Sequence, residues 1–589
     1  NNNHWTSGGI VASDCAMPDS PENNFCTMNP LHFRATYGMA TLSEGNLAYG
    51  STGLSSSWGA QFSTFNLNSG KWYAEVLTKG NTSCSIGVMN VGHYGYQHFL
   101  VQNPQNETGN WTLFMDETDT KSRLNGSLAD PTYTAFNNDQ VLGIALNADD
   151  KELSFYVDGT LQTGLGSSGV IDISTGGSSN DAWSFTANTA NGVSLTFVWN
   201  FGQDSSFAGD ETATSNSDAN GNGTFHTAPP SGYLALCTSN LPEPTIGPNS
   251  TTQADDYFNT VLHTGNGSAG SFTGVGFQPD FVWAKSRSNA YAHELWDSTR
   301  GVNSTLQSNS TGAEVTTTNR LVSFDTDGFS YGTQSNLYVN ATTSVAWNWL
   351  ANGGTATASG SESGNNPAYS VQANPTAGFS IVTYTGTGAT GTVPHGLGVV
   401  PQMMIFKNRG SAGNWAIYHG SNTAAPATDV IYLNLTNATA DTVNMFNDTA
   451  PTSSVFTVDT NANINEDGVA HVAYIFADVE GYSKFGGYTG NGNADGTFVF
   501  TGFRPAWVIY KKTSGAADWH QYDNKRETFN AVDLTIFPNG ASAEASGDAL
   551  DFLSNGFKQR NTGAEANGSG SSYIYMAFAE NPFVATSGT

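Results

Sequence analysis

One module of about 100 residues, the size of a small β-sandwich, occurs three times in the second half of the chain. The copies contain "HTGNGSAGSFTGVGFQPDFVWAK" from His263, "YTGTGATGTVPHGLGVVPQMMIFK" from Tyr384 and "YTGNGNADGTFVFTGFRPAWVIYK" from Tyr488. A repeat of this size is too large for a solenoid unit and can hold its own core. The repeat therefore predicts several domains of one kind rather than one large core.

The three copies share the order of their features. Each has a TG-rich opening, a proline, an apolar strand that ends in lysine, a Trp-bearing strand and a closing strand of alternating apolar residues. The prolines are Pro279, Pro401 and Pro505, the lysines are Lys285, Lys407 and Lys511, and the closing strands are "SVAWNWLA", "HVAYIFAD" and "YIYMAFAE". We predict that module 1 (257–352), module 2 (378–480) and module 3 (481–589) have the same fold, with module 1 the most divergent.

The segments between the modules differ in composition. Residues 353–377, "GGTATASGSESGNNPAYSVQANPTA", hold few large apolar residues and are rich in Gly and Ser, which is typical of a linker. The string "FADVEGYSKFGGYTGNG" at 476–492 joins modules 2 and 3 directly, and its glycines suit turns. We therefore expect modules 2 and 3 to share an interface.

Composition places the chain among folded all-β proteins. Only 12% of its residues are charged, while aromatic residues reach 12% and short apolar runs recur between polar turns. No amphipathic helix of normal length is evident. The sequence predicts several β-sandwich domains.

Charge and hydropathy bear on the possible partners. The net charge of −29 disfavours a phosphate backbone, so no nucleic acid partner is expected. No run approaches the roughly 18 apolar residues of a membrane helix, so no membrane insertion is expected. The opening "NNNHWTSGG" has neither part of a secretory signal, and whether the chain is a processed or truncated part of a longer protein stays open.

The four cysteines are too few for a disulfide scaffold and have no zinc-type spacing. Cys84 and Cys237 lie in apolar strand patterns, which predicts buried free thiols. Cys15 and Cys26 flank a short loop, and either a disulfide between them or two free thiols fits the sequence.

The first part of the chain has another strand pattern. "GKWYAEVLT", "SCSIGVMNV", "LGIALNADDKELSFYVDG" and "VSLTFVWNFG" are strands separated by turn residues at sandwich-like spacing. Their order, with an acidic turn and an "F-x-x-DG" hairpin, resembles the SPRY domain. The resemblance implies a bent two-sheet, jelly-roll sandwich over residues 51–246, with residues 1–50 leading into it or packing on it.

The junction "SGYLALCTSNLPEPTI", together with "DSPENNFCTMNPL" and "YIYMAFAENPF", resembles structural proteins of tailed, marine-type bacteriophages. That resemblance implies a virion protein of a tail fibre or another exposed appendage, which is extracellular after release. It also implies other virion proteins as partners. Phage fibres are commonly trimeric, and exposed sheet edges favour symmetric association, so we expect a homo-oligomer, with a trimer favoured.

The sequence contains only weak candidates for a metal-binding or catalytic site. Asp218, Asn220 and Asn222 in "DANGNG" occupy three positions of a calcium loop, but Pro229 stands where that loop needs glutamate. The carboxylate pairs Asp149–Asp150 and Asp325–Asp327 suit turns better than the paired acid and base of a glycosidase. We expect no enzyme and no resident cofactor, with calcium at the "DANGNG" loop as a weak alternative.

An Asp-x-x-Arg motif recurs after two of the Trp-bearing strands. It is Asp297 and Arg300 in module 1 and Asp523 and Arg526 in module 3, whereas module 2 has "YHGSN" there. A charge-assisted hydrogen bond could clamp a turn at each place. We favour this structural role over contact with a ligand.

For glycan binding, the aromatic and polar loops "HYGYQHF" at 93–99 and "SNAYAHELW" at 288–296 are the candidates. Aromatic rings can cover the apolar face of a sugar while loop carboxylates and amides bind its hydroxyls. The candidate residues are Tyr94, Tyr96, Tyr291 and Trp296; packing beneath the loops is the competing role. Attachment to a host-surface glycan or protein is the expected function, and a polysaccharide depolymerase or a secreted bacterial adhesin are the alternatives.

Overall fold

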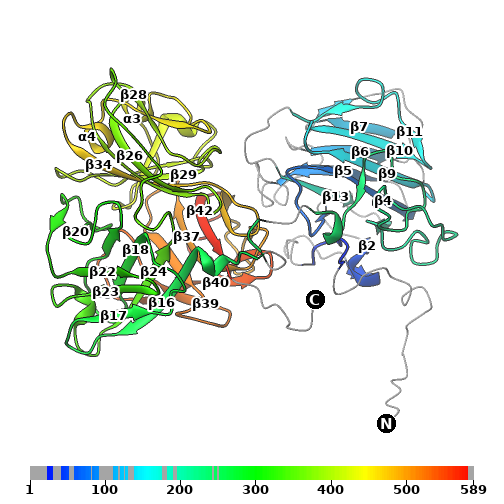
Figure 1. The fold of residues 1–589 in the computed structure, drawn as a ribbon. Helices are drawn as coiled ribbons and strands as arrows, with labels where there is room; N and C mark the ends of the chain where they lie inside the picture. Colours follow the sequence, from blue (N-terminus) through cyan, green and yellow to red (C-terminus); the bar gives the residue numbers. More distant parts are fainter. Residues whose placement is uncertain are drawn as a thin grey trace, which may run out of the picture. The chain divides into compact units, whose positions relative to one another are not determined.

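The computed structural model describes residues 23–30, 41–51, 59–80, 83–91, 110–116, 120–124, 127–129, 138–174, 182–189, 195–241, 245–247 and 251–580. The chain forms two compact units, Asn1–Pro242 and Glu243–Thr589 (Figure 1). Strands dominate both units. Two single-turn α-helices, α3 (Val443–Phe446) and α4 (Ala462–Asn465), lie in the second unit. Within the part of the chain that the structure describes, no helix is long and apolar enough to cross a membrane.

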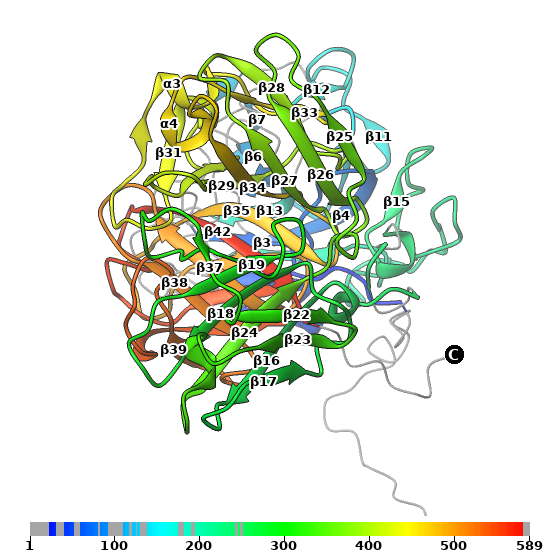
Figure 2. The same cartoon turned by 60° about the vertical axis from the view of Figure 1, so that its left-hand side comes forward.

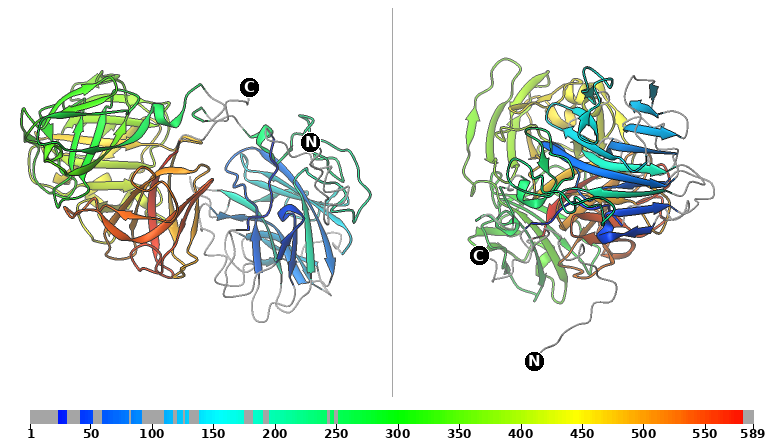
Figure 3. Two further views of the ribbon diagram at one scale, coloured as in Figure 1. Left: turned by 90° about the horizontal axis from the view of Figure 1, so that it is seen from below. Right: turned by 90° about the vertical axis from the view of Figure 1, so that its right-hand side faces the viewer.

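The N-terminal unit is a sandwich of two sheets (Figure 3). One sheet has the order β1 (Thr41–Ser43), β2 (Ala48–Ser51), β14 (Leu195–Asn200), β4 (Lys71–Gly80), β9 (Val141–Asn147), β10 (Glu152–Val157) and β11 (Thr160–Leu161), with β12 (Ile171–Asp172) and β15 (Leu234–Ala235) pairing with β10 and β4. The other has the order β3 (Gly59–Phe62), β13 (Trp183–Thr189), β5 (Ser83–Asn90), β6 (Asn110–Asp116), β7 (Thr120–Leu124) and β8 (Ser127–Ala129). This arrangement confirms the predicted two-sheet sandwich.

Alternating apolar residues of the two sheets form the core of this sandwich. Trp72 and Ile144 come from one sheet, and Val88, Trp111 and Trp183 come from the other. The rings of Trp111 and Trp183 meet edge to face at 5.1 Å between centroids. Since successive strand residues point to opposite faces, the alternation in "GKWYAEV" and "SCSIGVM" places these side chains inside.

The C-terminal unit contains three antiparallel sheets of one topology (Figure 2). Each sheet runs from the opening strand to the closing strand, then to the strand that carries the lysine, then to the Trp-bearing strand or its counterpart. In module 1 the order is β16 (Phe258–Thr264), β24 (Thr343–Trp349), β18 (Phe281–Ser286) and β19 (Glu294–Asp297). In module 2 it is β27 (Phe379–Thr385), β34 (Ala470–Phe476), β29 (Met403–Asn408) and β30 (Ala416–His419). In module 3 it is β35 (Ser483–Thr489), β42 (Ser572–Ala579), β37 (Pro505–Lys512) and β38 (Trp519–Asp523). The modules are therefore three copies of one fold.

A second sheet accompanies each of these three sheets. These are β17 (Gly270–Thr273), β23 (Gly328–Tyr331) and β22 (Leu321–Asp325) in module 1, β28 (Gly391–Pro394) and β33 (Val455–Val458) in module 2, and β36 (Phe498–Phe500), β41 (Gly556–Gln559), β40 (Ala545–Leu553) and β39 (Val532–Thr535) in module 3. In module 1, β20 (Ser304–Thr305) pairs with β21 (Val315–Thr316). Each module is thus a sandwich of two sheets, and the second sheet is the smaller one in modules 1 and 2.

The prediction that residues 353–377 form a linker is wrong. Its strands β25 (Ala358–Gly360) and β26 (Ala368–Asn374) extend the sheet of module 2, because β26 pairs with β27 along its whole length. Val371 and Ala373 alternate into the module 2 core. At the other edge, β31 (Asp429–Tyr432) and β32 (Ala440–Asp441) continue the sheet. The Gly- and Ser-rich flanks conceal this strand, since "AYSVQAN" carries only two fully buried apolar residues, Val371 and Ala373, beside the partly buried Tyr369.

One aromatic core joins all three modules, whereas the sequence predicts an interface between modules 2 and 3 only. Trp349 of module 1 lies 5.7 Å from Trp507 of module 3 and 6.4 Å from Phe476 of module 2, between ring centroids. Phe258 stacks on Phe578 at 4.9 Å. These residues lie at the same ends of equivalent strands, so the three sheets converge on one point.

The three contacts between modules repeat in a cycle. The Nε1 of Trp415 in module 2 donates to the carbonyl of Gln307 in module 1, and the Nε1 of Trp519 in module 3 donates to the carbonyl of Tyr432 in module 2, each at 2.9 Å. His293 of module 1 occupies the equivalent position, and its Nε2 lies 3.0 Å from the carbonyl of Phe537 in module 3. Each module contacts the next through the same strand, which closes a ring.

A second set of hydrogen bonds follows the same cycle. The backbone N–H groups of Glu314, Thr439 and Glu544 donate to the carbonyls of Arg409, Thr513 and Arg287, which lie in the next module around the ring. The donor–acceptor distances are 2.9, 3.0 and 2.8 Å. The C-terminal unit is therefore a pseudo-threefold ring within a single chain.

Acid should weaken the contact between modules 2 and 3 because His419 is buried there in its neutral form. Its Nδ1 accepts from the backbone N–H of Ser421, and its Nε2 lies 3.1 Å from the carbonyl of Tyr575. Burial lowers the pKa of His419 to about 4. The unfolded chain therefore binds a proton first as the pH falls below about 6.5, so stability is lost between about pH 6.5 and pH 4.

We expect this loss to reach about 3 kcal/mol for His419, at roughly 1.4 kcal/mol per pKa unit. Urea denaturation at pH 7.5 and pH 4.5 measures it. His419→Gln keeps the donor to Tyr575 and should lose less stability on acidification than the wild-type protein. Equal losses in both proteins would contradict the assignment.

Candidate functional site

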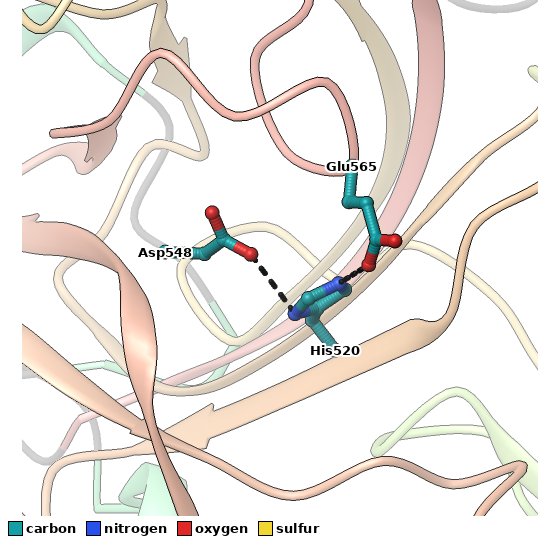
Figure 4. A group of neighbouring side chains, drawn as sticks. All are labelled: His520, Asp548 and Glu565. Atoms are coloured by element: carbon teal, nitrogen blue, oxygen red, sulfur yellow. Dashed lines mark hydrogen bonds and ion pairs between the residues drawn. The ribbon is translucent and has the colours of Figure 1, made fainter.

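The side chains of His520, Asp548 and Glu565 meet in module 3 (Figure 4). His520 lies on β38, Asp548 on β40 and Glu565 in the loop between β41 and β42. The ligand atoms of the three side chains lie within 4.8 Å of one another. Nε2 of His520 is 3.3 Å from Oε2 of Glu565, and Nδ1 is 4.0 Å from Oδ2 of Asp548. The imidazole thus lies between two carboxylates.

Aromatic rings hold the imidazole of His520 in place. The ring stacks on Tyr510 at 5.0 Å with an interplanar angle of 10°, and the edge of Phe537 meets it at 5.2 Å. Tyr510 is the β37 partner of His520, and Tyr522 is two residues along β38 on the same face. The hydroxyl of Tyr522 donates to the backbone carbonyl of Asp548 at 3.1 Å. The packing fixes both the ring and the segment that faces it.

Burial divides the cluster into an inner and an outer part. Only 2% of the His520 side chain is exposed, compared with 28% for Asp548 and 49% for Glu565. The hydrogen bond with His520 lowers the pKa of Glu565, against a smaller opposing effect of burial. No described residue hydrogen-bonds to Nδ1 of His520. The arrangement can hold a proton or a cation at this nitrogen.

Sequence reasoning missed this cluster, because its three members come from separate segments. One signal was present in the repeat. The position that follows His293, Trp415 and Trp519 is Glu294 in module 1, Ala416 in module 2 and His520 in module 3. An ionisable residue at an inward strand position is unusual, and in two of the three copies it is buried.

Two of the four aromatic residues predicted to bind glycans lie within the part of the chain that the structure describes. Tyr94 and Tyr96 lie outside the described residues. Tyr291 is half-buried. Trp296 is fully buried, packs on Phe329, and donates its Nε1–H to Oγ1 of Thr305 at 2.8 Å. The prediction for Trp296 is wrong, since strand alternation on β19 directs its ring into the core of module 1.

The "DANGNG" loop is an ordinary turn built on one carboxylate. Oδ1 of Asp218 accepts from the backbone N–H groups of Asn220 and Asn222, each at 2.9 Å. Oδ2 accepts from the backbone N–H of Ala235 and from Nδ2 of Asn240. Four N–H donors therefore use the lone pairs that calcium would need, which corrects the weak expectation of calcium at this loop.

The other predicted carboxylate pairs also serve turns. Asp149 accepts from the backbone N–H of Gly70 at 2.8 Å, and Asp150 accepts from Nδ2 of Asn147 at 2.8 Å. Asp325 accepts from two serine hydroxyls, and Asp327 accepts from the backbone N–H groups of the turn at 274–276. Each pair therefore has a structural role, and Asp149 and Asp327 hold turns that are distant from them in sequence.

The Asp-x-x-Arg motifs are clamps, as predicted, and they also reach across modules. The side chains of Asp297 and Arg300 are both fully buried and paired. Arg300 also pairs with Glu314 at 2.8 Å and donates to the hydroxyl of Tyr474 in module 2 at 3.1 Å. Glu314 pairs in turn with Arg409 of module 2 at 2.9 Å. A chain of buried charges thus joins modules 1 and 2.

The clamp of module 3 reaches module 1 by the same route. Arg526 pairs with Asp523 at 2.6 Å and with Glu544 at 2.9 Å, and Glu544 pairs with Arg287 of module 1. Trp347 of module 1, which is equivalent to Tyr474, donates its Nε1–H to Asp523 at 3.1 Å. Both ionic clamps therefore hold neighbouring modules together.

At the interface between modules 2 and 3, neutral residues stand at every position that is charged in the other two interfaces. His419 and Asn422 of module 2 stand at the Asp and Arg positions, and Thr439 and Thr513 replace the Glu and the second Arg. Met576 of module 3 stands where Tyr474 and Trp347 lie in the other two interfaces. The substitutions change together, so this interface has no buried charge left unpaired.

The repeated lysines are buried and bonded to backbone carbonyls. The Nζ atoms of Lys285, Lys407 and Lys511 donate to the carbonyls of Ser286, Gly413 and Lys512 at 2.7, 3.0 and 2.9 Å. Burial lowers the pKa of each lysine to about 8. These lysines satisfy loop carbonyls at the same place in every module.

Cys84 and Cys237 match the prediction of buried free thiols. Cys26, Cys84 and Cys237 are free and buried, and Cys15 lies outside the described residues. Burial raises the pKa of the Cys26 thiol to about 11, while a hydrogen bond with Thr64 opposes that shift. The thiols are therefore protonated at neutral pH and act as small apolar groups.

Comparison with solved structures finds SPRY domains. The chain is similar to the TRIM65 PSpry domain, with 16% identity and a TM-score of 0.22, over 30% of this chain and 92% of that one. It is similar to the SPRY domain of human HERC1, with 12% identity and a TM-score of 0.21, over 29% and 96%. The stonustoxin structure matches with 16% identity and a TM-score of 0.22, over 30% and 28%.

No curated protein matches the chain. A family model does match, over residues 253–582, and its description is "Domain of unknown function (DUF7483)". The match covers more than half of the chain and takes in all three modules, so the family corresponds to the whole ring rather than to a single module. The chain therefore belongs to the family of the domain of unknown function DUF7483.

Proposed function

We propose that this protein is a non-enzymatic structural component of a tailed bacteriophage virion, in a tail fibre or another exposed appendage that attaches to a host-surface glycan. The resemblance of the junction and terminal motifs to phage structural proteins supports this proposal. The observation that carries it is the closed ring of modules. Two of its interfaces commit their buried charges to holding modules together, which suits a part that bears load and displays a binding domain.

Attachment by such a protein depends on many weak contacts. β-Sandwich loops present aromatic and polar groups for single sugars, and several copies on one particle convert weak binding into avidity. We include homo-oligomerisation in the proposal, with a trimer as the favoured form. Light scattering of the purified chain at micromolar concentration tests this, and a monomeric mass would count against it.

The position of the protein is tested on particles. Antibodies raised against the purified chain should label intact virions at one repeated position in electron micrographs, and the chain should be found in purified particles by mass spectrometry. Labelling that appears only in infected-cell lysate would overturn the virion assignment. Release of oligosaccharides from host polysaccharide by the purified chain would favour the depolymerase instead.

The binding residues are tested separately from the position. Replacing Tyr94 and Tyr96 with Ala together should weaken attachment of the labelled protein to host cells about tenfold, because loss of stacking on a sugar costs on the order of 1.4 kcal/mol. Flow cytometry measures attachment, and circular dichroism checks folding. Phe529→Ala, at an exposed aromatic residue of the other unit that is not a candidate for glycan binding, is the matched control. Unchanged attachment by a folded double variant would refute these two residues.

A further inference from the structure

We propose that His520 and Asp548 bind a divalent transition-metal ion in module 3, with Zn²⁺ the ion that best fits, and that Glu565 orients the imidazole. The proposal is independent of the virion role. Figure 4 shows the three side chains of the site. The site lies on the face of β38 that carries Tyr522, and Phe537, which packs on the imidazole, also accepts through its carbonyl from His293 of module 1.

The positions of the protons in the cluster point to a bound cation. An ionised carboxylate can only accept a hydrogen bond, so the contact between Glu565 and Nε2 of His520 places the proton on Nε2. A neutral imidazole then has a lone pair on Nδ1. That lone pair faces the carboxylate of Asp548, which is also an acceptor. Two acceptors that face one another need a cation between them.

The distance between Nδ1 of His520 and Oδ2 of Asp548 favours a metal ion over a shared proton. An N–H···O hydrogen bond spans 2.7–3.2 Å between heavy atoms, and Nδ1 lies 4.0 Å from Oδ2 of Asp548. Zinc binds imidazole nitrogen at about 2.0–2.1 Å and carboxylate oxygen at about 2.0–2.2 Å. A separation of 4.0 Å is too long for a direct hydrogen bond. Two ligand atoms of tetrahedral zinc lie about 3.4 Å apart, so a small movement of the partly exposed Asp548 carboxylate would complete the site.

The burial of His520 is the second, independent observation. Only 2% of its side chain is exposed, and no described residue hydrogen-bonds to Nδ1. A buried nitrogen without a partner is costly, whereas coordination to an ion would use its lone pair. The rings of Tyr510 and Phe537 keep the imidazole from rotating away. The ligand is thus held in position before the ion arrives.

Glu565 has the role of an orienting group. Histidines that bind metals usually donate their other N–H to a carboxylate, which fixes the ring and increases its basicity. Glu565 does so from the loop between β41 and β42, and its outer side is open to water. Water molecules can therefore complete the coordination shell on the solvent side. An imidazole ligand favours zinc and related ions over calcium and magnesium.

The ion would tie together two segments of module 3 that are far apart in sequence. It would link β38 to β40 through His520 and Asp548, and the hydrogen bond to Glu565 would extend the link to the loop before β42. Binding to the folded state only should raise the thermal stability of the module.

Zn²⁺ titration by calorimetry, on the full chain freed of metal by chelation, tests the site. We expect the wild-type protein to bind one more equivalent of Zn²⁺ than Asp548→Asn binds. Glu565→Gln should weaken that equivalent about tenfold, within the range for loss of an orienting group. Glu362→Gln, at an exposed carboxylate of module 2, is the matched control and should bind as the wild-type protein does. Ca²⁺ should not compete.

A second measurement identifies the nitrogen. In ¹⁵N spectra of the imidazoles, Zn²⁺ should shift Nδ1 of His520, while Nε2 keeps its proton. Equal Zn²⁺ stoichiometry in the wild-type protein and Asp548→Asn would overturn the proposal, because the ion would lie elsewhere. It is also overturned if Zn²⁺ leaves Nδ1 unchanged and the two carboxylate variants alter only the protonation of His520, since the cation would then be a proton.

Discussion

Replacing Arg300 with Met is expected to lower the free energy of unfolding of the C-terminal unit by about 3–5 kcal/mol. The side chains of Asp297 and Arg300 are both fully buried, so the substitution leaves a carboxylate in the interior without its cation. It also removes the donor to Tyr474 and one partner of Glu314, which connect modules 1 and 2. Urea denaturation followed by circular dichroism measures the change.

Arg560→Met is the matched control. Arg560 is 44% exposed and lies 3.3 Å from Asp551 on the surface, so its removal should cost less than about 1 kcal/mol. A companion variant, Asp297→His with Arg300→Asn, copies the neutral pair of module 2. It should be less destabilised than Arg300→Met, because no buried charge is left alone. If the Arg300→Met variant were as stable as the Arg560→Met control, the clamp would not support the interface.

Trp349→Ala should cost about 3–5 kcal/mol, because it opens a cavity where all three modules meet. The Trp349 side chain is 1% exposed, and its ring centroid lies 5.2 Å from Phe281, 5.7 Å from Trp507 and 5.8 Å from Phe578. The loss should therefore affect the whole ring rather than module 1 alone. Hydrogen exchange should show faster opening in modules 1 and 3 together.

Trp349→Phe retains most of the apolar volume and should cost less than the alanine variant. Phe529→Ala is the control for loss of an aromatic ring, since Phe529 is 83% exposed and should change stability by less than about 0.5 kcal/mol. If faster exchange in Trp349→Ala stayed within module 1, the shared core would not couple the modules.

The repeat could be predicted because the features that define it are local. A proline before a strand, a lysine at its end and alternating apolar residues in the closing strand each depend on neighbours in sequence. Equivalent strands then follow from equivalent patterns. The strand at 368–374 was missed for the same reason, since only Val371 and Ala373 mark its buried face among polar neighbours.

The closure of the ring could not be predicted from local patterns. The contact between Glu314 and Arg409 joins residues 95 positions apart, and that between Arg287 and Glu544 joins residues 257 positions apart. The cluster around His520 likewise depends on β40 and on the loop between β41 and β42, which are distant from β38 in sequence. Trp296 shows the converse difficulty, because a tryptophan beside polar residues resembles a binding residue until its strand face is known.

Fusion of the three modules into one polypeptide gives the ring a freedom that a symmetric trimer lacks. In an assembly of identical subunits, every substitution appears three times, and each interface must tolerate it. Here each interface is encoded by its own residues. The interface that includes His419 and Met576 is therefore neutral, while the other two interfaces contain ion pairs. The same independence allows an imidazole at position 520 of one module only. Such a ring can present three similar faces while giving one of them a chemistry of its own, with a stoichiometry of one per chain.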